Sequence, residues 1–259
     1  MLLEGKVAVV SGVGPGMGRE VALALAREGA DVVLGGRTGS RLAKVAAEVE
    51  GCGRRALSVT CDVTDEGACH ALAERAAETL GGVDILVNNA FSDGDFSTVV
   101  EADLDAWRRT MEVNLFGALH MTRAVAPHME ARGEGRIVMV NTMSTERIQS
   151  GFGAYSASKN ALKSVTRTLA RELGPKGIRV NGIHPGYIWG SSVEWYFNHL
   201  ADQRGVTFDE VYAEVADQTC LGYLPDAAEI AGTVVFLASD LARAVTGQSL
   251  GVNAGHWFH

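Results

Sequence analysis

Tyr155 and Lys159 lie four residues apart in the sequence Tyr-Ser-Ala-Ser-Lys, with no proline or glycine between them. In a helix this spacing places both side chains on one face, one turn apart. A free tyrosine, whose pKa is about 10, does not exchange its proton readily at pH 7. An ammonium group beside it favours the phenolate and lowers that pKa. The pair therefore predicts a phenol that gives or takes a proton near neutral pH.

Residues 11–18, Ser-Gly-Val-Gly-Pro-Gly-Met-Gly, have the composition of a phosphate-binding turn. Glycines between a first strand and a helix let the backbone approach a pyrophosphate, and the helix N-terminus supplies free N–H groups. The spacing is Gly-x-x-x-Gly-x-Gly rather than Gly-x-Gly-x-x-Gly, so a tight turn that only packs a helix on a strand is the alternative. The residues expected at a dinucleotide here are Gly12, Gly14, Gly16, Met17 and Gly18.

The next two expected strands end in residues that can distinguish one nucleotide from another. Arg37 follows two glycines at a point where dinucleotide folds have an acid for the ribose 2′-hydroxyl. That acid is missing, and a guanidinium suits a 2′-phosphate in both charge and geometry. The sequence therefore favours NADP(H), with NAD(H) as the alternative if Arg37 is only a solvated loop residue. Asp62, after the third expected strand, could accept a hydrogen bond from the adenine amino group.

Short β-rich runs alternate with helical patterns along the whole chain. The runs cover residues 6–11, 31–34, 56–62, 84–88, 136–142, 178–184 and 248–253, and several are apolar throughout, as in a parallel sheet covered on both faces. Helical patterns cover residues 17–28, 65–80, 104–131 and 154–173, with a kink or early stop expected at Pro127. A capping box at 226–229 opens a last helix. The alternation predicts one doubly wound α/β (Rossmann) domain over residues 1–259.

Residues 187–225 interrupt this pattern. The stretch is too long for an ordinary connection after a strand, so we expect it to contain short helices of its own. It holds eight of the seventeen aromatic residues of the chain: Tyr187, Trp189, Trp195, Tyr196, Phe197, Phe208, Tyr212 and Tyr223. We predict a helical lid over a bulky, mostly apolar substrate. The alternative is that these aromatic residues only pack the lid itself or a subunit interface.

Taken together, these features resemble the short-chain dehydrogenase/reductase family in its compact form. The resemblance covers essentially the whole chain and rests on motifs in the family's order: Gly12, Gly16, Gly18, Asp62, Asn88-Asn89-Ala90, Asn114, Tyr155-x-x-x-Lys159 and Pro185-Gly186. It implies hydride transfer between a nicotinamide dinucleotide and a carbonyl/secondary alcohol pair. By this resemblance Tyr155 is the general acid/base, Lys159 lowers its pKa and holds the nicotinamide ribose, and Asn114 anchors a proton-relay water. Further cofactor contacts are expected at Val63, Asn88, Ala90, Pro185, Gly186 and Ile188.

Three positions depart from the family pattern. Thr142 stands where the family usually has a serine that polarises the substrate oxygen. Threonine keeps the hydroxyl donor, so we assign Thr142 this role, with Ser144 as the alternative. Phe91 replaces the glycine after Asn-Asn-Ala and brings an aromatic ring near the pocket. Gly190 replaces a threonine that contacts the carboxamide, a contact that Ser191 could supply.

Charge, cysteine usage and the N-terminus narrow the class of protein further. The net charge is −8 and the basic residues are scattered, so we expect no nucleic-acid partner. The spacing of the four cysteines and seven histidines predicts no metal site and suits thiols in a reducing compartment. Without a signal peptide or an apolar span, we expect a cytoplasmic protein with no membrane partner.

The family resemblance implies a small-molecule substrate and a homo-oligomer, dimer or tetramer. A nucleotide sensor or scaffold that has lost catalysis is the second interpretation.

Overall fold

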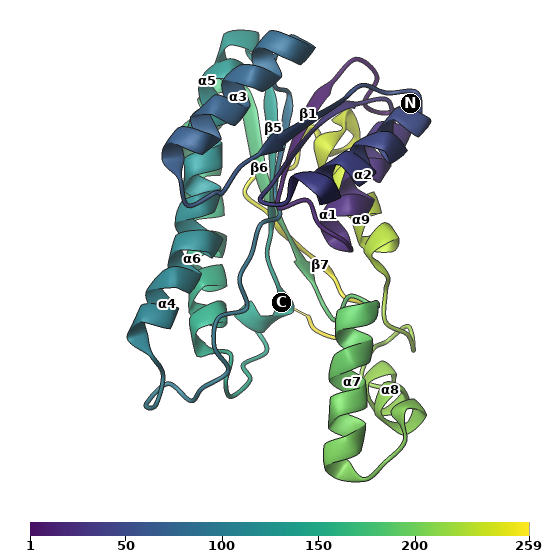
Figure 1. Ribbon diagram of the computed structural model, residues 1–259. Coiled ribbons are helices and arrows are strands. Elements are labelled where there is room, and N and C mark those ends of the chain that lie inside the picture. Colours follow the sequence, from purple (N-terminus) through teal and green to yellow (C-terminus); the bar gives the residue numbers. More distant parts are fainter. Residues whose placement is uncertain (259) are drawn as a thin grey trace.

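The computed structural model describes residues 1–258, which form a parallel sheet between two layers of helices (Figure 1). The strands are β1 (Val7–Ser11), β2 (Asp31–Gly36), β3 (Ala56–Thr60), β4 (Ile85–Asn88), β5 (Gly135–Val140), β6 (Ile178–Pro185) and β7 (Ser249–Val252). Their order is β3-β2-β1-β4-β5-β6-β7, and every neighbouring pair is parallel. The predicted α/β Rossmann sheet is confirmed, and each expected run forms a strand whose ends differ from the prediction by at most two residues.

Helices cover both faces of the sheet. One layer consists of α1 (Met17–Arg27), α2 (Gly39–Gly51) and α9 (Ala227–Ala238), and the other of α3 (Glu66–Leu80), α5 (Gly117–Arg132) and α6 (Gly153–Leu173), with α4 (Leu104–Met111) against α6. Alternate side chains of each strand enter the two cores, since Ala8 and Val10 pack in the first and Val7 and Val9 in the second. Burial on both faces explains why these strands are apolar throughout.

The long helical pattern at 104–131 is two helices joined by an irregular turn. Residues Glu112–Phe116 form a π-helical turn between α4 and α5, and Asn114 lies within it. Such turns inside helices occur frequently at functional sites. The early stop predicted at Pro127 is wrong, because α5 continues to Arg132 and ends at Gly133 in a left-handed conformation. Packing of α5 against the sheet and α3 outweighs the hydrogen bond that Pro127 cannot donate.

Residues 187–225, which we call the α7–α8 segment, contain two helices as expected, α7 (Ser191–Arg204) and α8 (Phe208–Ala216). They project beyond the carboxyl ends of the strands (Figure 1). Phe197 is completely buried at their centre, and most of the other aromatic residues of the segment pack around it. The segment leaves and rejoins the sheet layer at one neck, where the backbone N–H of Trp189 donates to the carbonyl of Pro225 at 2.8 Å.

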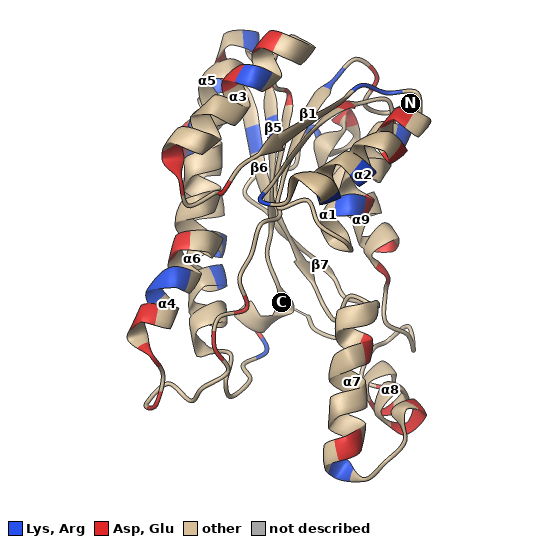
Figure 2. Cartoon of the chain, viewed as in Figure 1, with Lys and Arg blue, Asp and Glu red and all other residues tan. Residues whose placement is uncertain are grey.

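Acidic and basic residues are interspersed over the helices of the chain (Figure 2). Within residues 1–258, no helix is both long and apolar enough to cross a membrane. In the same part of the chain, no three side chains of the metal-binding types His, Cys, Asp and Glu come together in a group that could hold a metal ion.

Candidate active site

The glycine-rich turn after β1 is tightly packed on one side and open on the other. Gly12 has φ +75°, and a Cβ there would lie 2.4 Å from the Cα of Ala90. A Cβ on Gly18 would lie 2.6 Å from the carbonyl oxygen of Gly12. A Cβ on Gly14 or Gly16 would meet no atom within 4 Å. The turn therefore holds β1, β4 and α1 together while leaving space above its middle glycines, which fits a pyrophosphate at the N-terminus of α1.

A cleft of about 570 Å³ extends from this turn across the ends of β2 and β3. Arg37 directly follows β2, Arg41 lies in the first turn of α2, and both line the cleft with exposed side chains. Asp62 lies opposite, and its pKa is lowered by hydrogen bonds from Thr64 and by the charge of Arg37. Two guanidinium groups and the N-terminus of α2 thus bring positive charge to this end of the cleft, and the Asp62 carboxylate offsets part of it. The predicted residues Val63 and Ala90 also line it.

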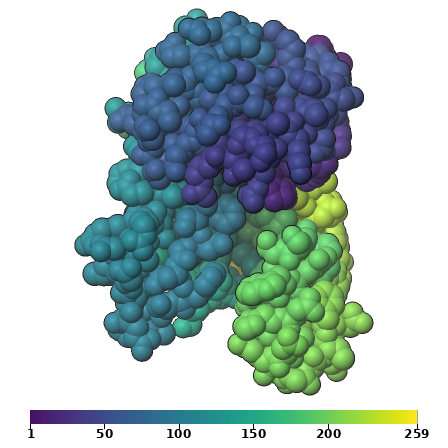
Figure 3. All heavy atoms as spheres, in the orientation of Figure 1, coloured from purple at the N-terminus to yellow at the C-terminus, as the bar shows by residue number. Residues whose placement is uncertain are grey.

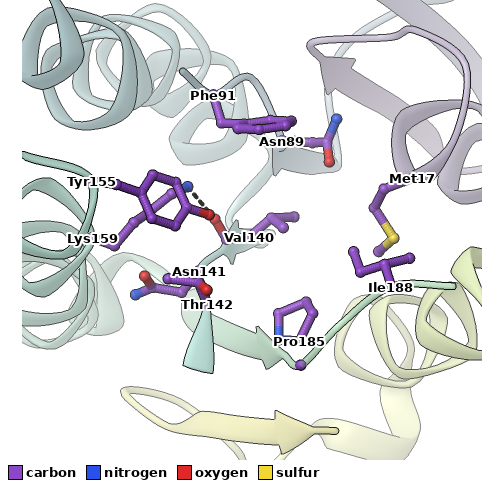
Figure 4. Close-up of a pocket in the computed structure, with 11 residues that line it drawn as sticks. Met17, Asn89, Phe91, Val140, Asn141, Thr142, Tyr155, Lys159, Pro185 and Ile188 are labelled. Carbon is purple, nitrogen blue, oxygen red and sulfur yellow. Dashed lines mark hydrogen bonds between the residues drawn. The ribbon is translucent and has the colours of Figure 1, made fainter. Parts of the chain in front are cut away.

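A narrower pocket of about 100 Å³ lies beside the glycine turn (Figure 4). It brings together side chains from β1–α1, β4, β5, α6 and β6 that are far apart in the sequence. Seven of the predicted site residues line it: Met17, Thr142, Tyr155, Lys159, Pro185, Gly186 and Ile188. The pocket opens toward the hollow between the α7–α8 segment and residues 91–155, which the space-filling view shows (Figure 3).

Tyr155 and Lys159 lie one turn apart on α6, as predicted. Burial shifts the pKa values of both side chains. The Nζ of Lys159 donates to the carbonyl of Val140 at 2.8 Å and lies 5.9 Å from the centre of the Tyr155 ring. Burial raises the pKa of Tyr155 to about 12, although a hydrogen bond with Thr142 acts in the opposite direction. Burial also lowers the pKa of Lys159 to about 8. The pKa of Tyr155 therefore lies above its ordinary value in this structure, because the loss of hydration outweighs the hydrogen bond with Thr142, and the lowering of that pKa by Lys159 stays a prediction.

Thr142, rather than Ser144, contributes its side chain to the pocket. The strand β5 ends at Val140, and residues Met143–Thr145 turn away as one turn of 3₁₀ helix. Ser144 therefore does not continue the strand face on which Thr142 lies. The Thr142 hydroxyl donates to the Ser144 hydroxyl at 3.3 Å and accepts the backbone N–H of Ser144 at 3.2 Å. Ser144 thus fixes the orientation of Thr142.

Asn114 connects the π-helical turn to the two sides of the pocket. Its Oδ1 accepts the backbone N–H of Ser92 at 2.7 Å, and its Nδ2 donates to the Ser92 carbonyl and to the Ser158 hydroxyl, both at 2.9 Å. These bonds tie the loop after β4 to the helix that carries Tyr155. The side chain of Asn114 therefore has a positioning function in addition to the water contact expected for its helix.

The expected contribution of Asn88 to the cleft is not found for its side chain. The Nδ2 of Asn88 faces α5, where it approaches the carbonyl of Ala118 and the hydroxyl of Thr122 at 3.4 and 3.2 Å. The next residue, Asn89, lines the pocket and donates to the carbonyl of Gly12 at 2.9 Å. Successive side chains point to opposite sides at the end of a strand, so only one of the two asparagines can face the cleft. The Asn-Asn-Ala motif therefore predicted where the cleft is lined, but not which of the two asparagine side chains faces it.

The fold and this site define a nicotinamide-dependent oxidoreductase acting on CH–OH groups, and the comparisons with known proteins agree. Residues 12–256 match the family model described as enoyl-(acyl carrier protein) reductase. The chain is 35% identical to the 7α-hydroxysteroid dehydrogenase of Escherichia coli (strain K12) over 253 residues, which cover 98% of this chain and 94% of that protein. It is 37% identical to the cis-4-hydroxycyclohexanecarboxylate dehydrogenase of Sinomonas cyclohexanicum over 251 residues, 97% of this chain and 96% of that one.

Solved structures give the same result. The carveol dehydrogenase of Mycobacterium avium in complex with NAD superposes with a TM-score of 0.92 at 31% identity, covering 98% of each chain. The chain therefore belongs to the short-chain dehydrogenase/reductase family.

Proposed function

We propose that the protein is an NADP(H)-dependent oxidoreductase that interconverts a bulky, mostly apolar secondary alcohol and its ketone. The observation that supports the choice of cofactor is the positive charge at one end of the cleft, with Arg37 after β2 and Arg41 at the start of α2. A 2′-phosphate suits two guanidinium groups beside a helix N-terminus. The related carveol dehydrogenase contains NAD, so the choice of cofactor depends on the residues at the end of β2 in this chain.

Different parts of the cleft hold the cofactor. We assign the pyrophosphate to the turn around Gly14 and Gly16, where the backbone is uncovered, and the adenine end to Asp62. Lys159, whose Nζ donates to the Val140 carbonyl, has further N–H donors for the nicotinamide ribose. When bound, the dinucleotide supplies or accepts the hydride.

The proton is handled by Tyr155. Because burial raises its pKa to about 12, Tyr155 holds at neutral pH the proton that ketone reduction requires, and a positive charge beside the phenol would bring that pKa closer to neutral and favour donation. We propose that the Tyr155 hydroxyl gives its proton to the carbonyl oxygen while the Thr142 hydroxyl turns its hydrogen from Ser144 to the same oxygen and donates a hydrogen bond to it. Asn114 keeps the two sides of the pocket in register through Ser92 and Ser158.

An aromatic wall beside Tyr155 supports an apolar substrate. Phe91 lines the narrow pocket and is 56% exposed. The rings of Phe96, Phe152 and Tyr155 follow one another edge to face, with centroids 5.1 and 6.5 Å apart. Relatives named for a hydroxysteroid and a hydroxycyclohexanecarboxylate are consistent with ring alcohols as substrates. The α7–α8 segment, on the other side of the hollow, is the proposed lid.

Cofactor titrations test the first half of the proposal. We expect NADPH to bind more tightly than NADH, and Arg37→Ala to weaken NADPH by about 10- to 100-fold while NADH changes by less than about twofold. Arg75→Ala, an exposed arginine on α3, is the matched control and should leave both affinities unchanged. Tighter binding of NADH by the unaltered protein would contradict the NADP(H) assignment.

A turnover screen with NADPH tests the second half. Ketones on fused rings should be reduced with a higher kcat/KM than short-chain ketones of similar reactivity. If the cofactor binds and no ketone or alcohol is turned over, the catalytically silent sensor or scaffold becomes the better interpretation.

We also propose that residues 1–259 fold as one domain and assemble as a homodimer or homotetramer, as the family implies. The exposed face of α6 carries small side chains, including Ala157 and Ser164, which allow close helix packing. Light scattering measures the mass of the particle, and a monomer at micromolar concentration would contradict the assembly.

A further inference from the structure

Two buried thiols lie in contact beside the cofactor cleft. Cys61 follows β3 and lines the cleft, whereas Cys69 lies in α3. Their Sγ atoms are 4.0 Å apart, and both cysteines are free. Their exposed fractions are only 4% and 0%, so the opening of the cleft beside Cys61 is the route by which a small reagent reaches them. Neither thiol contributes to the functions assigned above.

The two thiols are not equivalent. A hydrogen bond from Cys69 lowers the pKa of Cys61, and the same contact together with burial raises the pKa of Cys69. Cys61 is therefore the thiol that ionises first, and the thiolate is the nucleophile in thiol oxidation. Cys69, in contact with it, is placed to react with the oxidised sulfur in a second step.

We propose that Cys61 and Cys69 form an oxidation site, in which a hydroperoxide entering the cleft converts them to an intramolecular disulfide that weakens cofactor binding. In the first step the Cys61 thiolate attacks one peroxide oxygen, the O–O bond breaks, and Cys61 becomes a sulfenic acid while the second oxygen leaves as hydroxide. In the second step Cys69 attacks the Cys61 sulfur, the S–S bond forms and the S–O bond breaks. With hydrogen peroxide, two thiols give one disulfide and two molecules of water.

We expect closure of the S–S bond to move the end of β3. A disulfide requires about 2.05 Å between the sulfurs, so they approach by about 2 Å. Val63 resists this movement, because His120 donates to its carbonyl at 2.9 Å and its side chain fills the space beside Gly117. We therefore expect the displacement to fall on Cys61 and Asp62, which line the adenosine end of the cleft.

The end of β2 is coupled to the same movement. The backbone N–H of Cys61 donates to the carbonyl of Gly36 at 3.0 Å, directly before Arg37. Oxidation thus disturbs two of the residues assigned to the nucleotide. Because linkage is reciprocal, bound cofactor must oppose disulfide formation by the same factor by which the disulfide weakens the cofactor.

The test uses a full-length variant in which Cys52 and Cys220 are replaced by serine, so that only the pair remains. Hydrogen peroxide, added without cofactor, should produce a cross-linked peptide 61–69 that has lost two hydrogen atoms by mass spectrometry. The affinity for whichever of NADPH and NADH the reduced protein binds better should fall by at least about tenfold and recover with dithiothreitol. Saturating cofactor should slow the cross-link.

Two variants separate the disulfide from other oxidation. In Cys61→Ala, peroxide should leave cofactor affinity unchanged. In Cys69→Ala, the Cys61 sulfenic acid should accumulate and react with dimedone. Three results overturn the proposal: no cross-link under conditions that fully oxidise the exposed Cys220 of the unaltered protein, a cross-link with affinity changed by less than twofold, or an equal loss of affinity in Cys61→Ala. The NADP(H) proposal is tested by the affinities of the reduced protein alone, whereas the oxidation site is tested by the change in affinity after peroxide. Failure of one proposal can therefore be told from failure of the other.

Discussion

The nucleotide half of the molecule, residues 1–90, and the α7–α8 segment are built in different ways. In the nucleotide half, site residues are positioned by contacts between distant parts of the chain, such as the approach of Gly12 to Ala90. The α7–α8 segment instead packs mainly on itself around Phe197, with a few contacts to residues outside it, such as that of Tyr187 with His256. This difference indicates that changes in the first region affect both fold and cofactor, whereas changes in the second affect the substrate alone.

Replacement of Tyr155 gives the largest expected effect. It tests whether turnover can be lost while cofactor binding by the nucleotide half is kept. Tyr155→Phe should lower kcat by about 100- to 10,000-fold, because the proton donor is removed. Cofactor affinity should change by less than about twofold. Tyr223→Phe is the matched control, since that hydroxyl contacts Glu229 on the surface at 2.8 Å, away from the pocket. Near-normal turnover by the Tyr155→Phe variant would refute the assignment.

Phe197→Ala tests the independence of the α7–α8 segment. Removing a fully buried ring costs about 3–5 kcal/mol of packing, here confined to the segment. Amide hydrogen exchange in residues 191–216 should accelerate and the KM for a bulky ketone should rise, while NADPH affinity stays unchanged. Trp195→Ala, at a side chain that is 69% exposed, should change hydrogen exchange far less. Loss of cofactor binding in Phe197→Ala would mean that the two regions are not independent.

Burial of Lys159 against strand β5 predicts that the free energy of unfolding depends on pH. Burial lowers its pKa from 10.5 to about 8, so between these values the unfolded chain binds more protons than the folded protein. Stability of the unaltered protein relative to Lys159→Met should therefore rise by about 3 kcal/mol from pH 8 to pH 10.5. Above pH 10 Tyr155 acts in the opposite direction in both proteins, because its raised pKa keeps the proton on the folded state.

Urea unfolding at several pH values measures this difference. Lys44→Met reports the effect of removing a surface lysine from the same protein. Since Lys159 is 2% exposed and bonded to Val140 of β5, the trend should persist in a Phe197→Ala background. A difference that does not vary between pH 8 and 10.5 would show that the ammonium is hydrated.

Gly12 and Gly14, two residues apart in the same turn, give the smallest expected effects and a direct contrast within the nucleotide half. Gly12→Ala meets the backbone of Ala90 at a positive φ and should lower the free energy of unfolding by about 2 kcal/mol. Gly14→Ala meets no protein atom, so stability should hold while NADPH binding weakens. Thermal unfolding with and without NADPH distinguishes the two. Equal losses of stability in the two variants would contradict the claim that the turn is open at Gly14.

Most of the sheet could be predicted because buried parallel strands are apolar without interruption. Helix α2 was not predicted, since it begins with Gly39 and Ser40 after a turn-like stretch, although Leu42, Val45 and Val49 have helical spacing and are buried. In the structure they pack in the core cluster that also contains α1 and α9, a tertiary contact that compensates for the weak start.

The residue types of the narrow pocket could be predicted, but their electrostatics and orientation could not. Tyr155, Lys159 and Thr142 meet as expected because helix and strand geometry fix their positions. The raised pKa of Tyr155 depends on burial, which a sequence pattern does not show. The choice between Asn88 and Asn89 depends on where β4 ends, and a shift of one residue exchanges the side chain that faces the cleft.

The neck at Trp189 and Pro225 has a consequence for how such a protein can diversify. Because the backbone N–H of Trp189 bonds to the Pro225 carbonyl, the segment between them has adjacent ends, and its other bonds to the rest of the chain are few, such as those of Leu221 to Ala254 and of Gln218 to Arg147. Recombination at these two points could graft a foreign hairpin of helices onto the same catalytic platform without breaking a strand pair.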